Sequence, residues 1–266
     1  MHNLENLCRK ACEVVAEVGA FIRKEAENFD LSKVEYKSSD HDLVSFVDKE
    51  AEKRLVAGLK LVLPDAGFIG EEGSNTEGKD GLKWVIDPLD GTTNFMHGMP
   101  TYSISVALVR HETPEIGIVY EINRGELFYA WKDGGAYCNG KPIHTSKATQ
   151  FKDSLFVTGF PYSLRGKANQ YFEILKDIVN QSHGLRRLGS AAVDLAYVAA
   201  GRFEGYFEFN LNIWDVAGGI LIVQEAGGKV SDYYGGNEYL YGKQIVASNG
   251  GVHAELLNTI QKHWDK

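Results

Sequence analysis

Apolar residues recur at every third or fourth position through the first part of the chain, as they do on the buried face of a helix. This spacing, with charged residues between, predicts a long amphipathic helix that ends near Glu27. The apolar positions are Leu4, Leu7, Ala11, Val15, Val18 and Ile22. A polar segment follows at residues 30–42, and a second helix is predicted from near Asp48 to Leu63, directly before Pro64.

The middle of the chain changes to apolar runs of strand length that are separated by short polar links. Three such runs predict an antiparallel meander, at residues 103–110, 115–121 and 126–131. Asn139 and Gly140 come next and predict a hairpin turn, because this pair suits the backbone of a two-residue connection between strands.

Strand and helix patterns alternate in the second half of the chain. Strands are predicted at residues 155–158 and 204–209, and a strand at residues 244–248 is expected to close their sheet. Helices are predicted at residues 168–181, 190–201 and 252–262, and another begins near Asp215. Because no repeat or low-complexity linker interrupts the pattern, we expect a single domain of two packed halves, about residues 1–150 and 151–266.

Composition agrees with a compact soluble enzyme. The 266 residues, 44% of them hydrophobic, can bury a large core, and 28 basic against 36 acidic residues give a net charge of -8. This charge argues against a protein that binds a nucleic-acid polymer through its phosphates. The cysteines, Cys8, Cys12 and Cys138, are odd in number, so a disulfide framework is not expected. We expect a cytoplasmic protein without membrane contact, because no window is apolar enough to span a bilayer.

The segment Asp87-Pro88-Leu89-Asp90-Gly91-Thr92-Thr93 carries the strongest chemical signal. It follows the apolar run 84–86, so Asp87 is expected at the carboxyl end of a short buried strand that Pro88 stops. The next residues are expected to turn tightly and to begin a helix at Thr92, whose free N–H groups would face an anion. A metal ion and a phosphate could both bind at such a turn.

Two other acidic positions follow apolar runs in the same way. Glu71 and Glu72 come after the run 68–70, and Asp215 comes after Trp214 at the start of a predicted helix. We therefore expect Glu71 and Asp215 to share one cation site with the Asp87 segment, whereas strand alternation should turn Glu72 to the other face. Ligation by carboxylates, with no His or Cys cluster nearby, favours Mg²⁺ over zinc.

Two competing chemistries are excluded. Residues 135–141 match the GxxxxGK pattern of a nucleotide-binding loop, but Pro142 stands where a Ser or Thr would contact magnesium, and a hairpin is expected there. The sequence has no GxSxG motif and no Cys and His pair placed for acyl transfer. What remains is attack of water on a phosphate monoester, whose charge a pair of cations would neutralise.

These motifs give the chain its resemblance to a known family. They are GEE at residues 70–72, DPLDGTTNF at 87–95 and WDVAGG at 214–219, and the likeness extends through KSSDHDLVSFVD at 37–48 and GSAAVDLAYVAAGRFEGYFE at 189–208. Nearly from end to end, the chain resembles the inositol monophosphatase family. The resemblance implies an α+β fold, a layered α/β/α/β/α sandwich of the sugar phosphatase type. It also implies a homodimer that hydrolyses a small phosphorylated polyol, sugar or nucleotide, with magnesium dependence and lithium sensitivity.

The same resemblance assigns roles to single residues. Two or three Mg²⁺ ions would be bound by Glu71, Asp87, the Leu89 carbonyl, Asp90 and Asp215. Glu71 and Thr92 would orient the attacking water, and Asp48 would complete the catalytic group near a weaker third ion. The substrate would contact Asp90, Gly91, Thr92, Ser190, Ala191, Glu208 and Asp215, with the backbone N–H groups of Gly91 and Thr92 around the phosphate.

Several assignments have a simpler alternative. Asp48 could cap the second helix, and Glu208 could be an ordinary outward residue of its strand. Arg165, Arg186 and Arg187 could receive a second phosphate or could pair with surface carboxylates. Myo-inositol monophosphate is the leading substrate, and NADP, fructose 1,6-bisphosphate and phosphoadenosine phosphate are the alternatives. A catalytically silent, metal-stabilised binding module is an alternative of a different class, against which the complete set of carboxylates argues.

Overall fold

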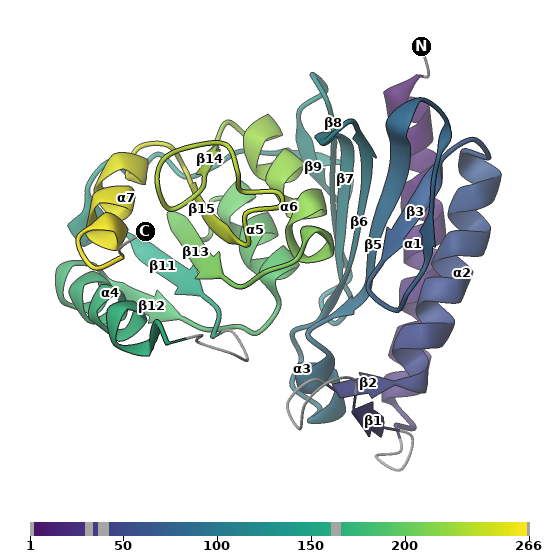
Figure 1. Cartoon of the computed structure of the whole chain (residues 1–266), viewed down its shortest axis with the longest axis horizontal. Helices are drawn as coiled ribbons and strands as arrows, with labels where there is room; N and C mark the ends of the chain where they lie inside the picture. Colours follow the sequence, from purple (N-terminus) through teal and green to yellow (C-terminus); the bar gives the residue numbers. More distant parts are fainter. Residues whose placement is uncertain (1–2, 30–33, 37–42, 161–165, 265–266) are drawn as a thin grey trace.

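The computed structural model describes residues 3–29, 34–36, 43–160 and 166–264. Helix pairs and sheets alternate through it in five layers, and the termini of the chain belong to the two outer layers (Figure 1). The α+β class and the α/β/α/β/α sandwich that the resemblance implied are therefore confirmed. The helices are α1 (Leu4–Ala26), α2 (Phe46–Val62), α3 (Thr92–Met96), α4 (Ala168–Gln181), α5 (Ala191–Ala199), α6 (Ile213–Glu225) and α7 (His253–Gln261).

Two large sheets form the strand layers, and a two-stranded sheet pairs β1 (Val34–Tyr36) with β2 (Leu43–Ser45). The first large sheet has eight strands, in the order β10 (Lys141–Ile143), β9 (Ala136–Cys138), β8 (Glu126–Trp131), β7 (Thr113–Glu121), β6 (Ser103–Arg110), β5 (Leu82–Asp90), β3 (Gly67–Gly70) and β4 (Asn75–Thr76). The second has five strands, in the order β12 (Gly184–Arg186), β11 (Leu155–Thr158), β13 (Gly205–Phe209), β15 (Gln244–Ser248) and β14 (Lys229–Ser231). The predicted meander is confirmed, because β6, β7 and β8 pair antiparallel in chain order.

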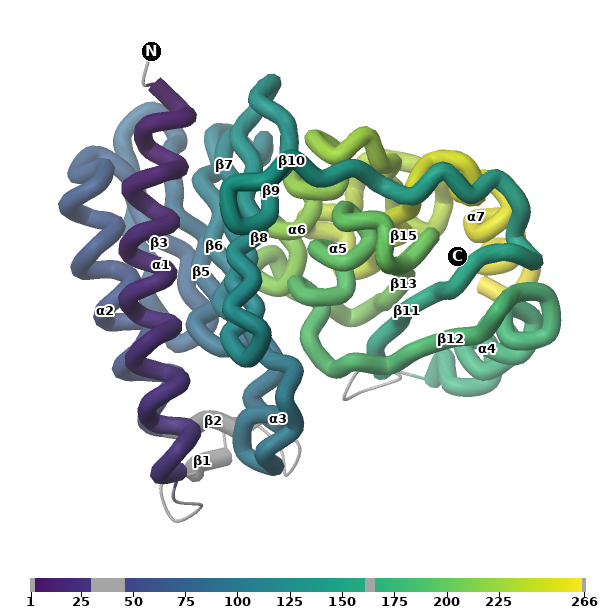
Figure 2. The backbone as a smooth tube through the Cα atoms, turned by 180° about the vertical axis from the view of Figure 1, so that it is seen from behind, coloured from purple at the N-terminus to yellow at the C-terminus, as the bar shows by residue number. Residues whose placement is uncertain are grey.

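Helices α1 and α2 lie side by side on the outer face of the eight-stranded sheet (Figure 2). The side chain of Asn3 caps α1 by accepting a hydrogen bond of 3.1 Å from the N–H of Asn6. The apolar face that the sequence predicted is buried against the sheet and α2 except at Leu4, which is partly buried, and Val15 and Ile22 are fully buried. Burial of this face stabilises the layer, since each such side chain contributes about 1.5–3 kcal/mol.

Helices α5 and α6 fill the space between the two sheets (Figure 1). Strand β6 is therefore covered on both faces, which explains why it reads as a continuous apolar run and not as an alternating one. Helix α6 approaches β7 very closely at Gly117, where an added Cβ would lie 2.3 Å from the carbonyl oxygen of Gly218. Glycine at both positions allows α6 to pack against the strand and so fixes where the helix begins.

Strand β5 corrects one prediction from the sequence. Pro88 was expected to stop the strand, but β5 continues to Asp90. The register shows why: Asp87 pairs with Ser105 and Asp90 pairs with Ser103, so β5 has one residue more than β6 in this stretch. A β-bulge accommodates Pro88, which has no N–H to donate to a neighbouring strand.

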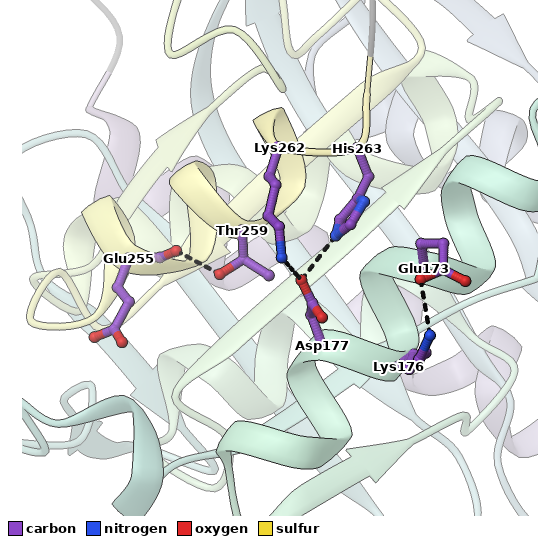
Figure 3. A network of polar contacts seen from close by, with 7 residues as sticks. All are labelled: Glu173, Lys176, Asp177, Glu255, Thr259, Lys262 and His263. Atoms are coloured by element: carbon purple, nitrogen blue, oxygen red, sulfur yellow. Dashed lines mark hydrogen bonds and ion pairs between the residues drawn. The ribbon is translucent and has the colours of Figure 1, made fainter.

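The five-stranded sheet corrects a second detail. The strand at residues 244–248 was expected to close the sheet, but β15 lies between β13 and β14, and the short β14 is the edge. Helices α4 and α7 cover the outer face of this sheet. Asp177 of α4 joins them, because it accepts hydrogen bonds of 2.7 Å from Lys262 and from His263 at the end of α7 (Figure 3).

The hairpin turn that the sequence predicted is confirmed. Asn139 and Gly140 form the turn between β9 and β10, with φ values of 48° and 79°, so the GxxxxGK match lies on a hairpin. The three cysteines are free. In the part of the chain that the structure describes, no helix combines the length and the apolarity needed to cross a bilayer.

Candidate active site

The predicted acidic residues come from three neighbouring elements. Glu71 follows β3, Asp87 and Asp90 lie on the last part of β5, and Asp215 lies in the first turn of α6. Because β3 and β5 are parallel neighbours, with Gly70 paired to Ile86, the next residue of each strand reaches the same edge of the sheet. The N–H of Glu71 donates to the carbonyl of Ile86 over 3.1 Å, which places Glu71 beside Asp87 as expected.

Burial and mutual repulsion change the acidity of this group. Asp87 is 2% exposed, and burial followed by the charges of Glu71, Asp90 and Asp215 raises its pKa well above 3.8. The pKa of Asp215 is also raised well above 3.8, first by burial and then by Glu71 and Asp90. Glu71, Asp87, Asp90 and Asp215 therefore sense one another, and we call these four residues the carboxylate cluster.

Asp90 connects the carboxylate cluster to α5. Its Oδ2 accepts hydrogen bonds from the Ser190 hydroxyl over 2.6 Å and from the N–H of Ala192 over 2.7 Å. Ser190 is the N-cap of α5, and its hydroxyl also lies 3.0 Å from that of Ser103 on β6. Burial raises the pKa of Asp90 to about 6 in spite of these hydrogen bonds, which oppose the shift.

Asp48 and Thr92 form a second part of the site. Asp48 is fully buried in the first turn of α2, and its Oδ1 lies 3.0 Å from the Thr92 hydroxyl. The same hydroxyl lies 3.0 Å from the carbonyl oxygen of Leu89, and its single proton can be donated to only one of the two acceptors at a time. Gly91 precedes Thr92 with φ of 98°, a left-handed backbone that glycine adopts without strain. The contact with Thr92 shows that helix capping alone does not account for Asp48.

The donors of the carboxylate cluster have the chemistry that a hard cation prefers. All are carboxylate oxygens, with the Leu89 carbonyl adjacent, and Mg²⁺ takes such ligands. Among the described residues, no three His, Cys, Asp or Glu side chains are already gathered at the spacing that would hold a metal ion. The raised pKa values nevertheless indicate a group that a positive charge would stabilise, because it would offset the repulsion among the carboxylates.

Glu208 lies on β13, so the five-stranded sheet contributes this residue to the site. Its side chain is 8% exposed and accepts a hydrogen bond of 2.8 Å from the Tyr206 hydroxyl. Burial raises its pKa to about 7, and the charge of Asp90 adds to the effect. Glu208 is therefore not an ordinary outward residue, since its carboxyl group is buried within the electrostatic range of Asp90.

One contact of Glu208 was missed in the sequence. An added Cβ at Gly159, just after β11, would lie 2.1 Å from Oε2 of Glu208, so only glycine leaves room for this carboxyl group. A glycine directly after an apolar run is the signal that could have drawn attention to this position. Arg186 and Arg187 are exposed, and within the described ranges neither forms an ion pair with a carboxylate. Arg165 and residues 37–42 lie outside the described residues.

Comparison with known proteins covers nearly the whole chain. Residues 3–265 match the inositol monophosphatase family. The chain is 40% identical over 259 residues to the Nus factor SuhB of Pseudomonas aeruginosa, covering 95% of each chain. It is also 40% identical over 222 residues to an inositol-1-monophosphatase of Mesorhizobium japonicum, covering 83% of this chain and 84% of the relative. The crystal structure of the extragenic suppressor protein suhB from Bartonella henselae superposes with a TM-score of 0.89 at 35% identity, over 95% of this chain and 97% of that one.

Proposed function

This chain belongs to the inositol monophosphatase family, and from that premise we propose that it is a Mg²⁺-dependent phosphatase of small phosphate monoesters. The leading substrate is myo-inositol monophosphate, and a relative that is 40% identical has the name inositol-1-monophosphatase. The observation that carries the proposal is the carboxylate cluster, in which three separate elements bring four acids together around the buried Asp87 against their mutual repulsion. A protein gains nothing in stability from such a group without a cation.

Two or three Mg²⁺ ions would be held by Glu71, Asp87, the Leu89 carbonyl, Asp90 and Asp215. When bound, they would supply positive charge against the phosphoryl oxygens and lower the pKa of water. The remaining steps belong to the chain itself. Thr92 donates a hydrogen bond to Asp48 over 3.0 Å, so its hydroxyl oxygen is free to accept a hydrogen bond from the attacking water, and as that water loses its proton to Thr92 the hydroxyl would pass its own proton to the Asp48 carboxylate. Because the Thr92 hydroxyl then donates to Asp48 and not to Leu89, the Leu89 carbonyl oxygen is free to bind a metal ion.

The substrate would lie between the two sheets. The backbone N–H groups of Gly91 and Thr92, after the bulge in β5, would donate to the phosphate. Glu208, Ser190 and Ala191 would meet the hydroxyl groups of the alcohol, because Ser190 donates to Asp90 and the charge of Asp90 reaches Glu208. In this arrangement the hydroxyl pattern of the alcohol, not the phosphate, decides between substrates. We further propose a cytoplasmic homodimer that lithium inhibits.

Phosphate release by the purified protein tests this function. The substrates are inositol 1-phosphate, fructose 1,6-bisphosphate, NADP and phosphoadenosine phosphate, each with Mg²⁺ and with EDTA. We expect Mg²⁺-dependent release that is fastest with inositol 1-phosphate. Asp87→Asn and Asp215→Asn should each lower the rate by several orders of magnitude, while Asp80→Asn, at an exposed turn, should leave it unchanged. Equal turnover by Asp87→Asn and the wild type would contradict the proposed site.

A second candidate function comes from the names of the relatives. The Pseudomonas aeruginosa protein has the name Nus factor, at 40% identity over 95% of both chains. We therefore propose as the alternative that this chain also acts as a binding module in the role that the name describes. The Asp215→Asn variant separates the two functions, because it should lose turnover and keep the fold. If Asp215→Asn can replace the wild-type protein in a cell that lacks it, the function that the cell requires is binding and not turnover.

A further inference from the structure

A second hollow lies at the end of α6 that is remote from the carboxylate cluster. Asp215 lies in the first turn of α6, whereas Leu221, Gln224 and Glu225 line this hollow at the other end of the helix. Since α6 has 13 residues, the helix is about 20 Å long. The volume of the hollow is about 660 Å³, within the range of small-molecule pockets. We call it the distal pocket, and it is separate from the candidate active site.

Two leucines and two tyrosines line one part of the distal pocket, whose surface is otherwise mostly polar. Leu221 and Leu240 are buried beneath it, and the rings of Tyr239 and Tyr241 line its wall. The side chain of Gln224 donates to the Tyr239 hydroxyl over 3.3 Å, which links that ring to α6. Tyr241 keeps 49% of its surface exposed, so its ring is available to a ligand. Such a surface suits an organic molecule better than a hydrated inorganic ion.

Negative charge surrounds this aromatic wall. The acidic residues that line the pocket are Glu112, Asp133, Glu225 and Glu238, against Lys132 as the basic residue. Glu225 accepts hydrogen bonds from the N–H groups of Asp133 and Gly135 over 2.9 and 2.8 Å, which holds the turn after β8 at the rim. Glu112 lies close enough to Tyr241 for its charge to raise the pKa of the phenol, after the larger effect of burial. The pocket therefore favours a positive ligand.

The turn between β6 and β7 places the large side chains of His111 and Glu112 at the pocket. Smaller residues would be easier to accommodate in such a turn. His111 and Glu112 have φ values of 45° and 68°, and a two-residue turn of this kind ordinarily uses Asn-Gly. Non-glycine residues in the left-handed region are strained, and they cluster at ligand sites. A smaller hollow of about 280 Å³ adjoins the first, and both are lined by His111, Glu112 and Tyr241.

From the aromatic wall and the acidic rim, we propose that the distal pocket binds a small organic cation of the quaternary ammonium or alkylamine class. A cation over the ring of Tyr241 is attracted to the face of the ring, and the carboxylate of Glu112 beside it neutralises the charge. The aliphatic part of the ligand would cover Leu221 and Leu240. This site is independent of the phosphatase reaction, because no residue of the carboxylate cluster takes part in it.

Isothermal titration calorimetry with choline tests the proposal on the full chain. Its neutral carbon isostere, 3,3-dimethylbutan-1-ol, has the same shape without the charge. EDTA is present throughout, so that no divalent metal contributes to binding. A loss of phosphatase activity therefore cannot be confused with a loss of choline binding at the distal pocket. We expect choline to bind and the isostere to bind at least about tenfold more weakly, because both the cation–π attraction and the ionic attraction are lost.

Variants locate the binding. Tyr241→Leu should weaken choline binding about fivefold, Tyr241→Phe should retain it because the ring remains, and Glu112→Gln should weaken it. The control is Glu255→Gln on the exposed face of α7, which should bind choline as the wild type does. Thermal unfolding confirms that each variant is folded. Three results would each overturn the proposal. They are equal binding of choline and its isostere, choline binding that is unchanged in Tyr241→Leu and Glu112→Gln, and no binding of either choline or butylamine.

Discussion

Replacement of Asp90 by asparagine should make the metal-free protein more stable at neutral and alkaline pH. Burial raises the pKa of Asp90 from 3.8 to about 6, so the folded protein holds this proton more tightly than the unfolded chain does. Stability therefore falls as the pH rises from about 4 to about 6, and the loss is complete above that range. The difference between the two pKa values corresponds to about 3 kcal/mol.

The asparagine side chain can keep the two hydrogen bonds that Asp90 accepts. Both are made to a single oxygen, from Ser190 over 2.6 Å and from Ala192 over 2.7 Å, and the amide oxygen can occupy that position. The amide nitrogen would then face the other carboxylates, where a donor is favourable. In EDTA at pH 8, the variant should be more stable by up to about 3 kcal/mol, or roughly 6–12 °C in Tm.

Denaturant unfolding at pH 8 and near pH 4, with EDTA or with Mg²⁺, measures this effect. The gain should fall to a small fraction near pH 4, where Asp90 is protonated in the folded protein and in roughly 40% of unfolded chains, and Mg²⁺ should reduce the gain at pH 8 by stabilising the wild type more. The exposed Asp80→Asn variant is the control and should show neither effect. An Asp90→Asn variant less stable than the wild type in EDTA at pH 8 would refute the reasoning.

Three further results are expected from the same structure. Gly159→Ala should raise KM for a polyol phosphate several-fold and change kcat less, because its Cβ would lie 2.1 Å from the carboxyl group of Glu208; equal kinetic constants would argue against the contact. Asp177→Asn should destabilise the protein at pH 7 and progressively less as the pH falls below about 4, because the hydrogen bond to His263 lowers the pKa of Asp177 and the stability that it contributes is lost in acid. The wild type should also lose stability as pH falls from about 6.5 to about 4, because burial lowers the pKa of His253 to about 4 and the unfolded chain takes up that proton first; His253→Gln should flatten this part of the pH profile.

Local patterns were sufficient to predict the long elements of the fold. The three central strands were found because continuous apolar runs end at clear turn residues, and β6 and β8 begin and end as predicted. The short edge strands β12 and β14 were missed, since each has three residues and gains its pairing from a neighbouring strand. The continuation of β5 past Pro88 was missed because a bulge depends on the register of the partner strand, which one segment does not contain.

The candidate site was predictable where an acid follows an apolar run, and not where a contact joins distant elements. Glu71 and Asp87 were expected together because each directly follows an apolar run of strand length, and the structure pairs those two strands as parallel neighbours. The link between Asp48 and Thr92 spans 44 positions in the chain, and it depends on how α2 packs beside β5. The requirement for glycine at position 159 arises in the same way, from a carboxyl group on another strand.

Asp215 shows why the carboxylate cluster needs an explanation beyond local structure. It lies in the first turn of α6 and accepts a hydrogen bond of 2.7 Å from the N–H of Asn212, as a helix-capping acid does. The helix dipole favours such a charge by up to about 2 kcal/mol, and the charged hydrogen bond adds about 1.5–3 kcal/mol. Both effects lower a pKa, yet the pKa of Asp215 is raised well above 3.8 by burial and by Glu71. Desolvation and repulsion therefore outweigh what capping supplies, so helix capping alone does not account for Asp215, and a cation of the kind proposed would offset the repulsion.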